Sequence, residues 1–362
     1  MMAATINSII PSSATASSPM ASSPMASSAM ASSTMASPPM ASSAMASSAM
    51  ASPPTASFTI ASSTMASPLL IQSGEVTLPL LAEHSLVVQA GATATIIATA
   101  LPSQQFHIIV EEGARATMCV VHPNVKSPPR TSNQGMAHFE IHTAHTGINT
   151  GVINSICKNY ADIKKDALLQ RVDVLLGDGH LNLQTKLLEP GAEMIAVQAF
   201  VGSADIQSDV YHLASHTKSL MLAKGVLQKS TGKYRGTIKI EKQASGCRAH
   251  QRSDMLLLDE ASKGDAEPIL DVHNDDVICS HGATLGQIDE LHLFYLKSRG
   301  LPEAAARQMI IAGFLQPILE FIPRESLREE IAREIQHHLQ LDGWNVSINT
   351  KYNPGYENKN HM

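Results

Sequence analysis

The chain has 362 residues, of which 44% are hydrophobic and 16% are charged, enough for one large domain or two small ones with a sizeable core. Its 26 basic and 32 acidic residues give a net charge of −6, which argues against nucleic-acid binding through clustered Lys and Arg. Four widely spaced cysteines without a CxxC pair argue against a zinc ribbon and against a disulfide framework.

Residues 1–68 are dominated by a five-residue unit that reads MASSP, MASSA, MASST and MASPP. The segment has little large apolar surface, so it is predicted to be disordered. It lacks the charged start and apolar core of a secretory signal, and no run of about 18 apolar residues predicts a membrane helix. We therefore expect a cytoplasmic protein without a membrane partner. A plastid transit peptide is the alternative, and the absence of Arg and Lys disfavours it.

Residues 69–283 consist of short apolar runs separated by turn residues, such as "HSLVVQ", "FHIIVEE", "RVDVLL" and "LNLQTKLL". Many of these runs alternate with period two, as half-buried strands do, and residues 160–170 are the main ambiguous stretch. About a dozen such strands predict a sandwich, a barrel or a β-solenoid. A set of glycines at turn-like points favours the solenoid weakly, although no strict repeat length can be fixed: Gly177, Gly179, Gly191, Gly202, Gly225, Gly232, Gly236 and Gly246.

Residues 284–342 switch to helical periodicity. Asp289 can cap a first helix that ends at Gly300, and Pro317 should kink or split a second helix. The third helix carries one apolar stripe, formed by Leu327, Ile331, Ile335 and Leu339. Residues 343–362 are polar and are predicted to form a frayed tail.

Cys279 and His281 stand two apart in "DDVICSHGATLGQIDE", which reads as a strand followed by a turn and a helix. Alternate strand side chains share a face, so the thiol and the imidazole should project together, about 7 Å apart. Both are good ligands for soft or borderline metals, but two ligands do not close a site. The alternative from spacing alone is a small buried cysteine beside a hydrogen-bonded histidine.

Other histidines give weaker signals. In "HFEIHTAHTG", His138 and His142 share a face of a strand and His145 faces the other way, which disfavours a metal site. The pair His337-His338 near a helix C-terminus more simply complements the helix dipole. The chain has no GxSxG motif and no P-loop, so neither serine hydrolysis nor ATP hydrolysis is indicated.

Residues 236–322 closely resemble the SufB/SufD family of iron–sulfur cluster assembly proteins. The resemblance is carried, in the order of the family, by "RGTIKI", "MLLLDEAS", "EPILDV", "CSHGAT", "DELHLFYLKSRG" and "AAARQMIIAGF". Within the family the sequence is most similar to SufD, because "CSHGAT" is the SufD-type form. In addition, "LLLDEASKGDAEPIL" lacks the cysteine that SufB has near the preceding turn.

The resemblance implies a mainly β protein with a right-handed parallel β-helix (β-solenoid) at residues 69–283 and a C-terminal α-helical domain at residues 284–342. It further implies a non-catalytic scaffold subunit of a SufBCD-type complex, which pairs with a SufB-like protein through the β-helix. The C-terminal helices would dock a SufC-like ABC ATPase, so truncation after Gly286 should abolish SufC binding and leave pairing with SufB largely intact. The residues expected at the dock are Leu291, Phe294, Tyr295, Arg299, Gly300 and Phe314.

For Cys279 and His281, the resemblance implies cluster assembly at the interface with SufB, which would supply the missing ligands. An iron–sulfur cluster would be held there transiently, and no tightly bound cofactor is expected. One departure is that the family's ordered helical segment ahead of the β-helix is replaced here by the repeats. Two alternatives stay open: a β-helix enzyme of the secreted type that acts on polysaccharides, and a homodimeric SufB-like scaffold.

Overall fold

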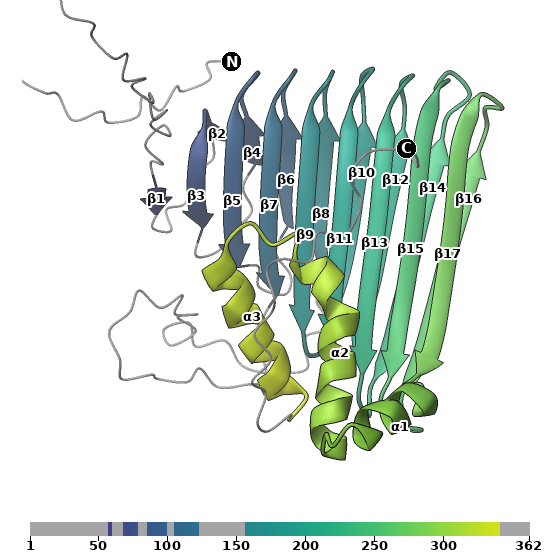
Figure 1. The fold of residues 1–362 in the computed structure, drawn as a ribbon. Helices are drawn as coiled ribbons and strands as arrows, with labels where there is room; N and C mark the ends of the chain where they lie inside the picture. The colour runs from purple at the N-terminus through teal and green to yellow at the C-terminus, as the bar shows by residue number, and fades with distance from the viewer. Residues whose placement is uncertain (1–56, 60–67, 79–84, 100–104, 123–155, 341–362) are drawn as a thin grey trace, which may run out of the picture. The chain divides into compact units, whose positions relative to one another are not determined.

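The computed structural model describes residues 57–59, 68–78, 85–99, 105–122 and 156–340. Within these ranges the chain forms a succession of strands followed by three helices (Figure 1). The strands are β1 Ser57–Thr59, β2 Leu69–Ile71, β3 Gly74–Leu78, β4 Ser85–Val88, β5 Thr93–Thr99, β6 Gln105–Val110, β7 Arg115–His122, β8 Ile156–Ile163, β9 Leu168–Leu176, β10 Gly179–Leu187, β11 Glu193–Val201, β12 Ala204–His212, β13 Lys218–Leu227, β14 Thr231–Ile240, β15 Cys247–Leu257, β16 Lys263–Val272 and β17 Val277–Gln287. The helices are α1 Glu290–Ser298, α2 Glu303–Leu319 and α3 Glu325–His338.

Consecutive strands alternate between two sheets. The odd-numbered strands form a nine-stranded sheet and the even-numbered strands form an eight-stranded sheet, each in chain order. Each strand pairs in parallel with the strand two positions further along the chain, so each coil of the chain stacks on the coil before it. This arrangement confirms the predicted parallel β-helix with a C-terminal helical domain (Figure 1).

The coils differ in length, which explains why the sequence shows no strict repeat. Side chains that bond across neighbouring coils are 25 residues apart at Glu193 and Lys218 and 30 apart at His250 and Ser280. They are 32 residues apart at Arg235 and Glu267. The differences in coil length lie outside the paired stretches, and the strands stay in register.

The glycines have two different roles. Gly177, Gly191, Gly202 and Gly246 lie at turns with positive φ, as their turn-like context indicates. Gly179 is the first residue of β10. The turn assignment is wrong for three others, which lie inside β13 and β14: Gly225, Gly232 and Gly236. At Gly225 a Cβ atom would lie 2.2 Å from Cζ of Phe200, so packing inside the solenoid demands a residue without a side chain.

The inner faces of the two sheets enclose a hydrophobic core that runs along the described coils. Alternate residues of each strand point into it, for example Met194, Ala196 and Phe200 on β11. The ambiguous stretch 160–170 belongs to this pattern, because it forms the end of β8, a turn and the start of β9. The stretch that the sequence left ambiguous is therefore strand and turn, without a helix.

The helix signals are also confirmed. The Asp289 side chain accepts hydrogen bonds from the backbone N–H groups of Leu291 and His292, and Gly300 follows the helix end with φ of 91°. Helix α2 continues through Pro317 to Leu319, so the proline does not split it. The predicted stripe of α3 is buried along its length.

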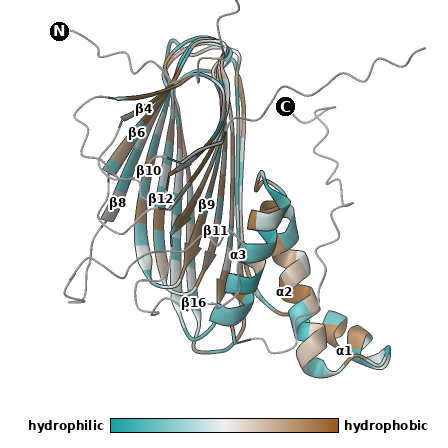
Figure 2. Cartoon of the chain, turned by 90° about the vertical axis from the view of Figure 1, so that its left-hand side faces the viewer, coloured by the Kyte–Doolittle hydropathy of each residue, from teal (hydrophilic) through white to brown (hydrophobic). Residues whose placement is uncertain are grey.

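Helices α2 and α3 cover the outer face of the nine-stranded sheet (Figures 1 and 2). Their apolar side chains form a second core with outward-facing residues of the sheet, such as Val172 and Val197. Truncation after Gly286 would expose this face to water, so we expect it to destabilise the β-helix. The predicted effect of that truncation on pairing with SufB stays a prediction.

Strand β17 continues to Gln287, four residues beyond the predicted end of the β-helix. Strand β1 lies within the segment predicted to be disordered, where it pairs with β3. The rest of the repeat segment up to residue 67 and the predicted tail lie outside the described residues. In the part of the chain that is described, no helix is both long and apolar enough to cross a membrane.

Candidate metal-ligating site on the terminal strand

Cys279 and His281 lie on β17, the last strand of the nine-stranded sheet. One edge of β17 pairs with β15, where Cys279 stands opposite Ala249 and His281 stands opposite Gln251. No other described strand pairs with the second edge of β17. Backbone N–H and C=O groups along that edge are therefore available to another strand.

The two candidate ligands share the inner face of the strand. Cys279 is half-buried and packs against the core between the sheets. Ser280 faces outward, where its hydroxyl shares a hydrogen bond with the His250 imidazole. His281 returns to the inner side by strand alternation and is exposed. The sequence prediction that thiol and imidazole project together is consistent with this alternation.

The alternative of a buried, hydrogen-bonded histidine does not hold at this position. His281 is exposed, and its ring forms no hydrogen bond or ion pair with any residue that the structure describes. Both ring nitrogens are therefore available to a ligand or to a partner. An exposed imidazole beside a half-buried thiol suits the binding of a thiophilic metal.

The thiol of Cys279 is protonated at neutral pH. Burial raises its pKa above the ordinary value, and the neighbouring Cys247 thiol adds to the rise. The thiolate is the form that ligates metals, so binding must displace the proton. Iron at Cys279 would release this proton, and the free thiol is a poor nucleophile until then.

Contacts on the outer face tie β17 to the body of the sheet. Thr284 donates a hydrogen bond to the Asp254 carboxylate on β15. The same carboxylate lies 3.1 Å from the Arg252 guanidinium and 3.6 Å from the Lys224 ammonium. These contacts hold Asp254 ionised, since hydrogen bonds and cations lower its pKa despite its partial burial. The strand that carries the two ligands is thus anchored on one side.

Two ligands from this chain do not complete a metal site. No group of three or more His, Cys, Asp or Glu side chains in the described part of the chain is arranged to hold a metal ion. His138, His142 and His145 lie outside the described residues, and His337 and His338 lie in the last turn of α3. Burial lowers the pKa of His338, which disfavours a charge that would complement the helix dipole. A cluster at Cys279 and His281 therefore requires further ligands from another source.

The residues expected at the ATPase dock fall into two groups. Leu291, Phe294 and Tyr295 lie on one side of α1 and expose 73%, 68% and 54% of their surface. Arg299 extends this surface, with its guanidinium carbon 5.2 Å from the centre of the Tyr295 ring. Gly300 forms the turn that follows α1. We call Leu291, Phe294 and Tyr295 the α1 apolar surface.

Phe314 belongs to a different environment. It is half-buried on α2, and its ring centre lies 4.2 Å from the Lys224 ammonium. This cation–π contact joins α2 to β13. The structure thus places Phe314 in the packing between helix and sheet rather than on the α1 apolar surface.

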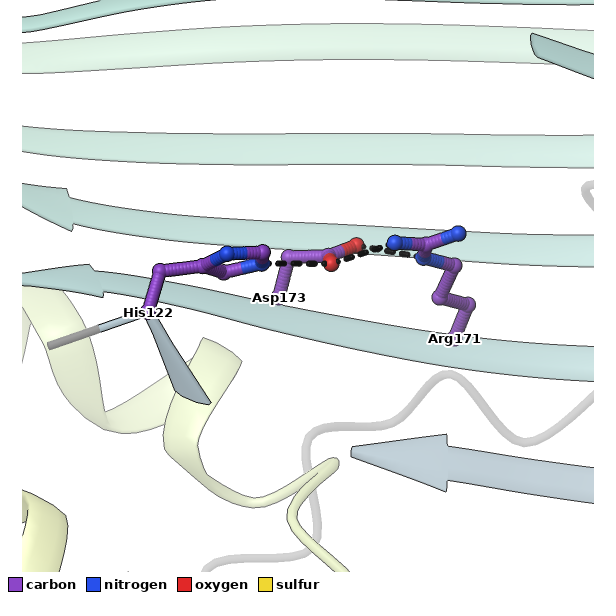
Figure 3. A network of polar contacts seen from close by, with 3 residues as sticks. All are labelled: His122, Arg171 and Asp173. Atoms are coloured by element: carbon purple, nitrogen blue, oxygen red, sulfur yellow. Dashed lines mark hydrogen bonds and ion pairs between the residues drawn. The ribbon is translucent and has the colours of Figure 1, made fainter. Parts of the chain in front are cut away.

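Sequence reasoning missed a buried ionic network inside the solenoid (Figure 3). The Asp173 carboxylate on β9 lies between the Arg171 guanidinium, at 2.7 and 2.8 Å, and Nε2 of His122, at 3.1 Å. Arg171 also stacks its charge against the Phe106 ring at 5.0 Å. The available signal was a pair of charged residues, Arg171 and Asp173, that stand two apart in the apolar run "LLQRVDVLL". Residues two apart on a strand share a face, so both side chains lie on the inner face.

The fold and the site define a class of protein: a parallel β-helix with a C-terminal helical domain and a thiol–imidazole pair on its terminal edge strand. Residues 79–314 match the family model described as SUF system FeS cluster assembly, SufBD core domain. The match covers more than half of the chain, and the chain belongs to the SufBD family. The family-level prediction from the sequence is therefore confirmed.

Relatives with curated names agree with this membership. The iron–sulfur cluster assembly protein SufD of Bacillus subtilis (strain 168) is 29% identical over 200 residues, which cover 53% of this chain and 46% of the relative. A SufBD family protein of Mycobacterium leprae is 38% identical over 155 residues, covering 42% and 17%. One of Staphylococcus haemolyticus is 31% identical over 202 residues, covering 52% and 43%. The matches span less than half the length of these relatives.

Proposed function

We propose that this chain is a non-catalytic scaffold subunit of an iron–sulfur cluster assembly complex of the SufBCD type. In this proposal Cys279 and His281 supply two ligands to a cluster that forms at the interface with a SufB-like partner and is then passed on. The cluster is cargo, held transiently. The observation that carries the proposal is an unpartnered imidazole and a half-buried thiol on one face of an edge strand.

The end of the solenoid supports pairing with another β-helix. Strands β16 and β17 are the last strands of their sheets, so each has an edge without a described partner. Ile278, Leu285 and Val272 expose 65%, 42% and 38% of their surface along these strands. Exposed apolar side chains beside free backbone groups favour the addition of a partner strand. A partner seated there would bring its own ligands next to His281.

The test is a His281→Ala variant in the purified complex with SufB-like and SufC-like partners. Because the ring makes no bond to the described residues, its removal is expected to leave the melting temperature and the complex unchanged. Iron and sulfide content after reconstitution is expected to fall at least ten-fold. Cys279→Ala is expected to have a milder effect, because a partner cysteine and His281 would remain.

His273→Ala is the matched control, since His273 is exposed beyond the end of β16 and pairs with Asp271 at 2.8 Å. It should leave cluster content at the wild-type level. Normal iron and sulfide content in an intact His281→Ala complex would reject the proposed role of this site.

We propose that the α1 apolar surface docks the SufC-like ATPase. A contiguous exposed apolar patch on a well-capped helix fits a helix-on-surface contact with another protein. The neighbouring Arg299 adds a cation at the rim of the patch. Neither nucleic acid nor a membrane is proposed as a partner, and the cytoplasm remains the predicted location.

The double substitution Leu291→Ser and Phe294→Ser should weaken SufC binding at least 100-fold, because truncated anchors at an interface each cost about 2 kcal/mol or more. The side chains are exposed, so the unfolding midpoint should stay within a few degrees of the wild type. Isothermal titration with the ATPase measures the effect. Met309→Ser, an exposed apolar position on α2, is the control. Wild-type affinity of the double variant would place the dock elsewhere.

Membership in the SufBD family disfavours the polysaccharide-acting enzyme. The homodimeric SufB-like scaffold remains the second candidate, because the same free edges could pair two copies of this chain. Mass measurement of the complex assembled from tagged SufB-like and SufC-like partners separates the two. A complex that contains two copies of this chain and no SufB-like subunit would favour the homodimer.

A further inference from the structure

Gln251 carries a buried acceptor that has no partner. The side chain lies on the inner face of β15 and exposes 2% of its surface. Its Nε2 donates to the backbone carbonyls of Gly236, at 3.1 Å, and Ile269, at 3.3 Å, and these two bonds fix the amide. Its Oε1 is buried and forms no hydrogen bond.

A buried carbonyl oxygen without a donor carries a desolvation penalty, so such groups call for an explanation. The site around this one is built to hold it. At Gly236 on β14, a Cβ atom would lie 2.5 Å from the Gln251 Oε1, so any side chain there would displace the amide. The chain therefore keeps the amide in place and leaves one acceptor unused.

The sheet register puts Gln251 beside His281. Gln251 and His281 are direct partners across β15 and β17, and direct partners project from the same face about 4.8 Å apart. The amide is fixed, whereas the exposed imidazole has no bond to the described residues and can turn about its side-chain torsions. The two side chains are not hydrogen-bonded in this structure, so the ring must rotate inward to meet the amide.

We propose that Gln251 is a positioning residue for His281: its Oε1 accepts the N–H of the imidazole nitrogen that does not ligate iron. This inference rests on the proposed function of His281 as a cluster ligand. A histidine that ligates a metal commonly donates its other N–H to an acceptor, which fixes the tautomer and the ring orientation. Gln251 supplies such an acceptor without a charge, so the imidazole stays neutral and able to ligate.

Other unpaired buried atoms do not fit this role. Ser253 Oγ is also buried without a partner, but Ser253 stands opposite Ala283 in the register. Gln198 leaves a donor, its Nε2, unpaired. It lies on β11, which β13 separates from β15 in the sheet. Among the described residues with unpaired buried atoms, Gln251 combines an acceptor, a fixed orientation and the position opposite His281.

The first experiment uses the full chain labelled with ¹⁵N-histidine, with Cd²⁺ as a diamagnetic thiophilic probe. In the wild type with Cd²⁺, His281 should show a single tautomer whose N–H is protected from exchange. Gln251→Met keeps the size and removes the acceptor, so the protected N–H should disappear and Cd²⁺ affinity should fall 10- to 100-fold. Gln251→Glu keeps an acceptor but loses the two Nε2 bonds that fix the side chain, so it should recover both readouts in part.

Ser253→Ala is the matched control, with a buried unpaired oxygen on the same strand face, and it should change neither readout. Gly236→Ala displaces the amide from the opposite sheet and should reproduce the effect of Gln251→Met. An unchanged tautomer and Cd²⁺ affinity in a folded Gln251→Met variant would overturn the proposal. If Gln251→Met does not fold, the absence of a protected His281 N–H in the wild type with Cd²⁺ would overturn the proposal instead.

Cluster content separates this inference from the proposed function. If His281→Ala loses iron and sulfide while Gln251→Met retains both, the positioning role of Gln251 is wrong and the function of His281 stands. If His281→Ala also retains them, the proposed function itself fails. Loss of iron and sulfide in both His281→Ala and Gln251→Met, with recovery in Gln251→Glu, supports the proposed function and the positioning role of Gln251.

Discussion

Replacing Arg171 by leucine is expected to lower the free energy of unfolding by about 3–5 kcal/mol, because it leaves a buried carboxylate without its main cation. Asp173 is 1% exposed and accepts two hydrogen bonds from Arg171 and one from His122. Burial by itself would raise the pKa of Asp173, but Arg171 and His122 outweigh burial and lower it to about 2. Urea unfolding followed by circular dichroism measures the loss.

Two further variants test whether the buried charge causes the loss of stability in Arg171→Leu. Arg235→Leu removes an exposed arginine whose partner, Glu267, is also exposed, and it should leave stability nearly unchanged. Replacing His122, Arg171 and Asp173 together by apolar residues should recover most of the stability lost in Arg171→Leu. A variant Arg171→Leu as stable as the wild type would show that the network contributes nothing.

The same network gives a pH dependence with a defined sign. Because the pKa of Asp173 is lower in the folded chain, its contribution is fully present above the ordinary pKa of about 4. The contribution falls as pH drops from about 4 to about 2. Wild type should therefore lose more stability over this range than the triple apolar variant does.

Removing residues 288–362 is expected to abolish a stable fold rather than release an intact β-helix. Helices α2 and α3 bury a set of apolar side chains on the outer face of the nine-stranded sheet: Ile97, Val172, Val174, Val197, Val201 and Val226. Exposing one fully buried Val or Ile side chain costs about 1.5–3 kcal/mol, and the truncation exposes several at once. The sum is comparable to the roughly 5–15 kcal/mol that stabilises a typical domain.

Soluble yield and thermal unfolding of the truncated chain measure this effect. Aggregation or a loss of cooperative unfolding is expected. The double variant Leu291→Ser and Phe294→Ser is the control, since it alters the exposed side of α1 and leaves α2 and α3 in place. A truncated chain that unfolds at the wild-type midpoint would show that the helices do not stabilise the sheet. Truncation is therefore unsuitable as a test of ATPase docking.

Local sequence determined most of the elements. Period-two alternation marked the strands, Asp289 and Gly300 marked the limits of α1, and the stripe that includes Leu327 and Ile331 marked the buried face of α3. These signals depend on neighbours within one or two turns or pleats of the chain, so they can be read without the fold. The motifs across residues 236–322 indicated the family, and "CSHGAT" singled out Cys279 and His281.

Tertiary structure decided what those residues face. Strand partners are far apart in the sequence and belong to coils of unequal length, for example 25 residues at Glu193 and Lys218 and 32 at Arg235 and Glu267. No local pattern therefore fixes which strand ends the sheet or which residue stands opposite His281. Only coil stacking brings Gln251 beside it and places His122 against Asp173. The covering role of α2 and α3 also depends on tertiary structure, because the sheet face that they cover is assembled from strands distant in sequence. Burial and pairing are properties of that packing, and they decide which polar groups are left without partners.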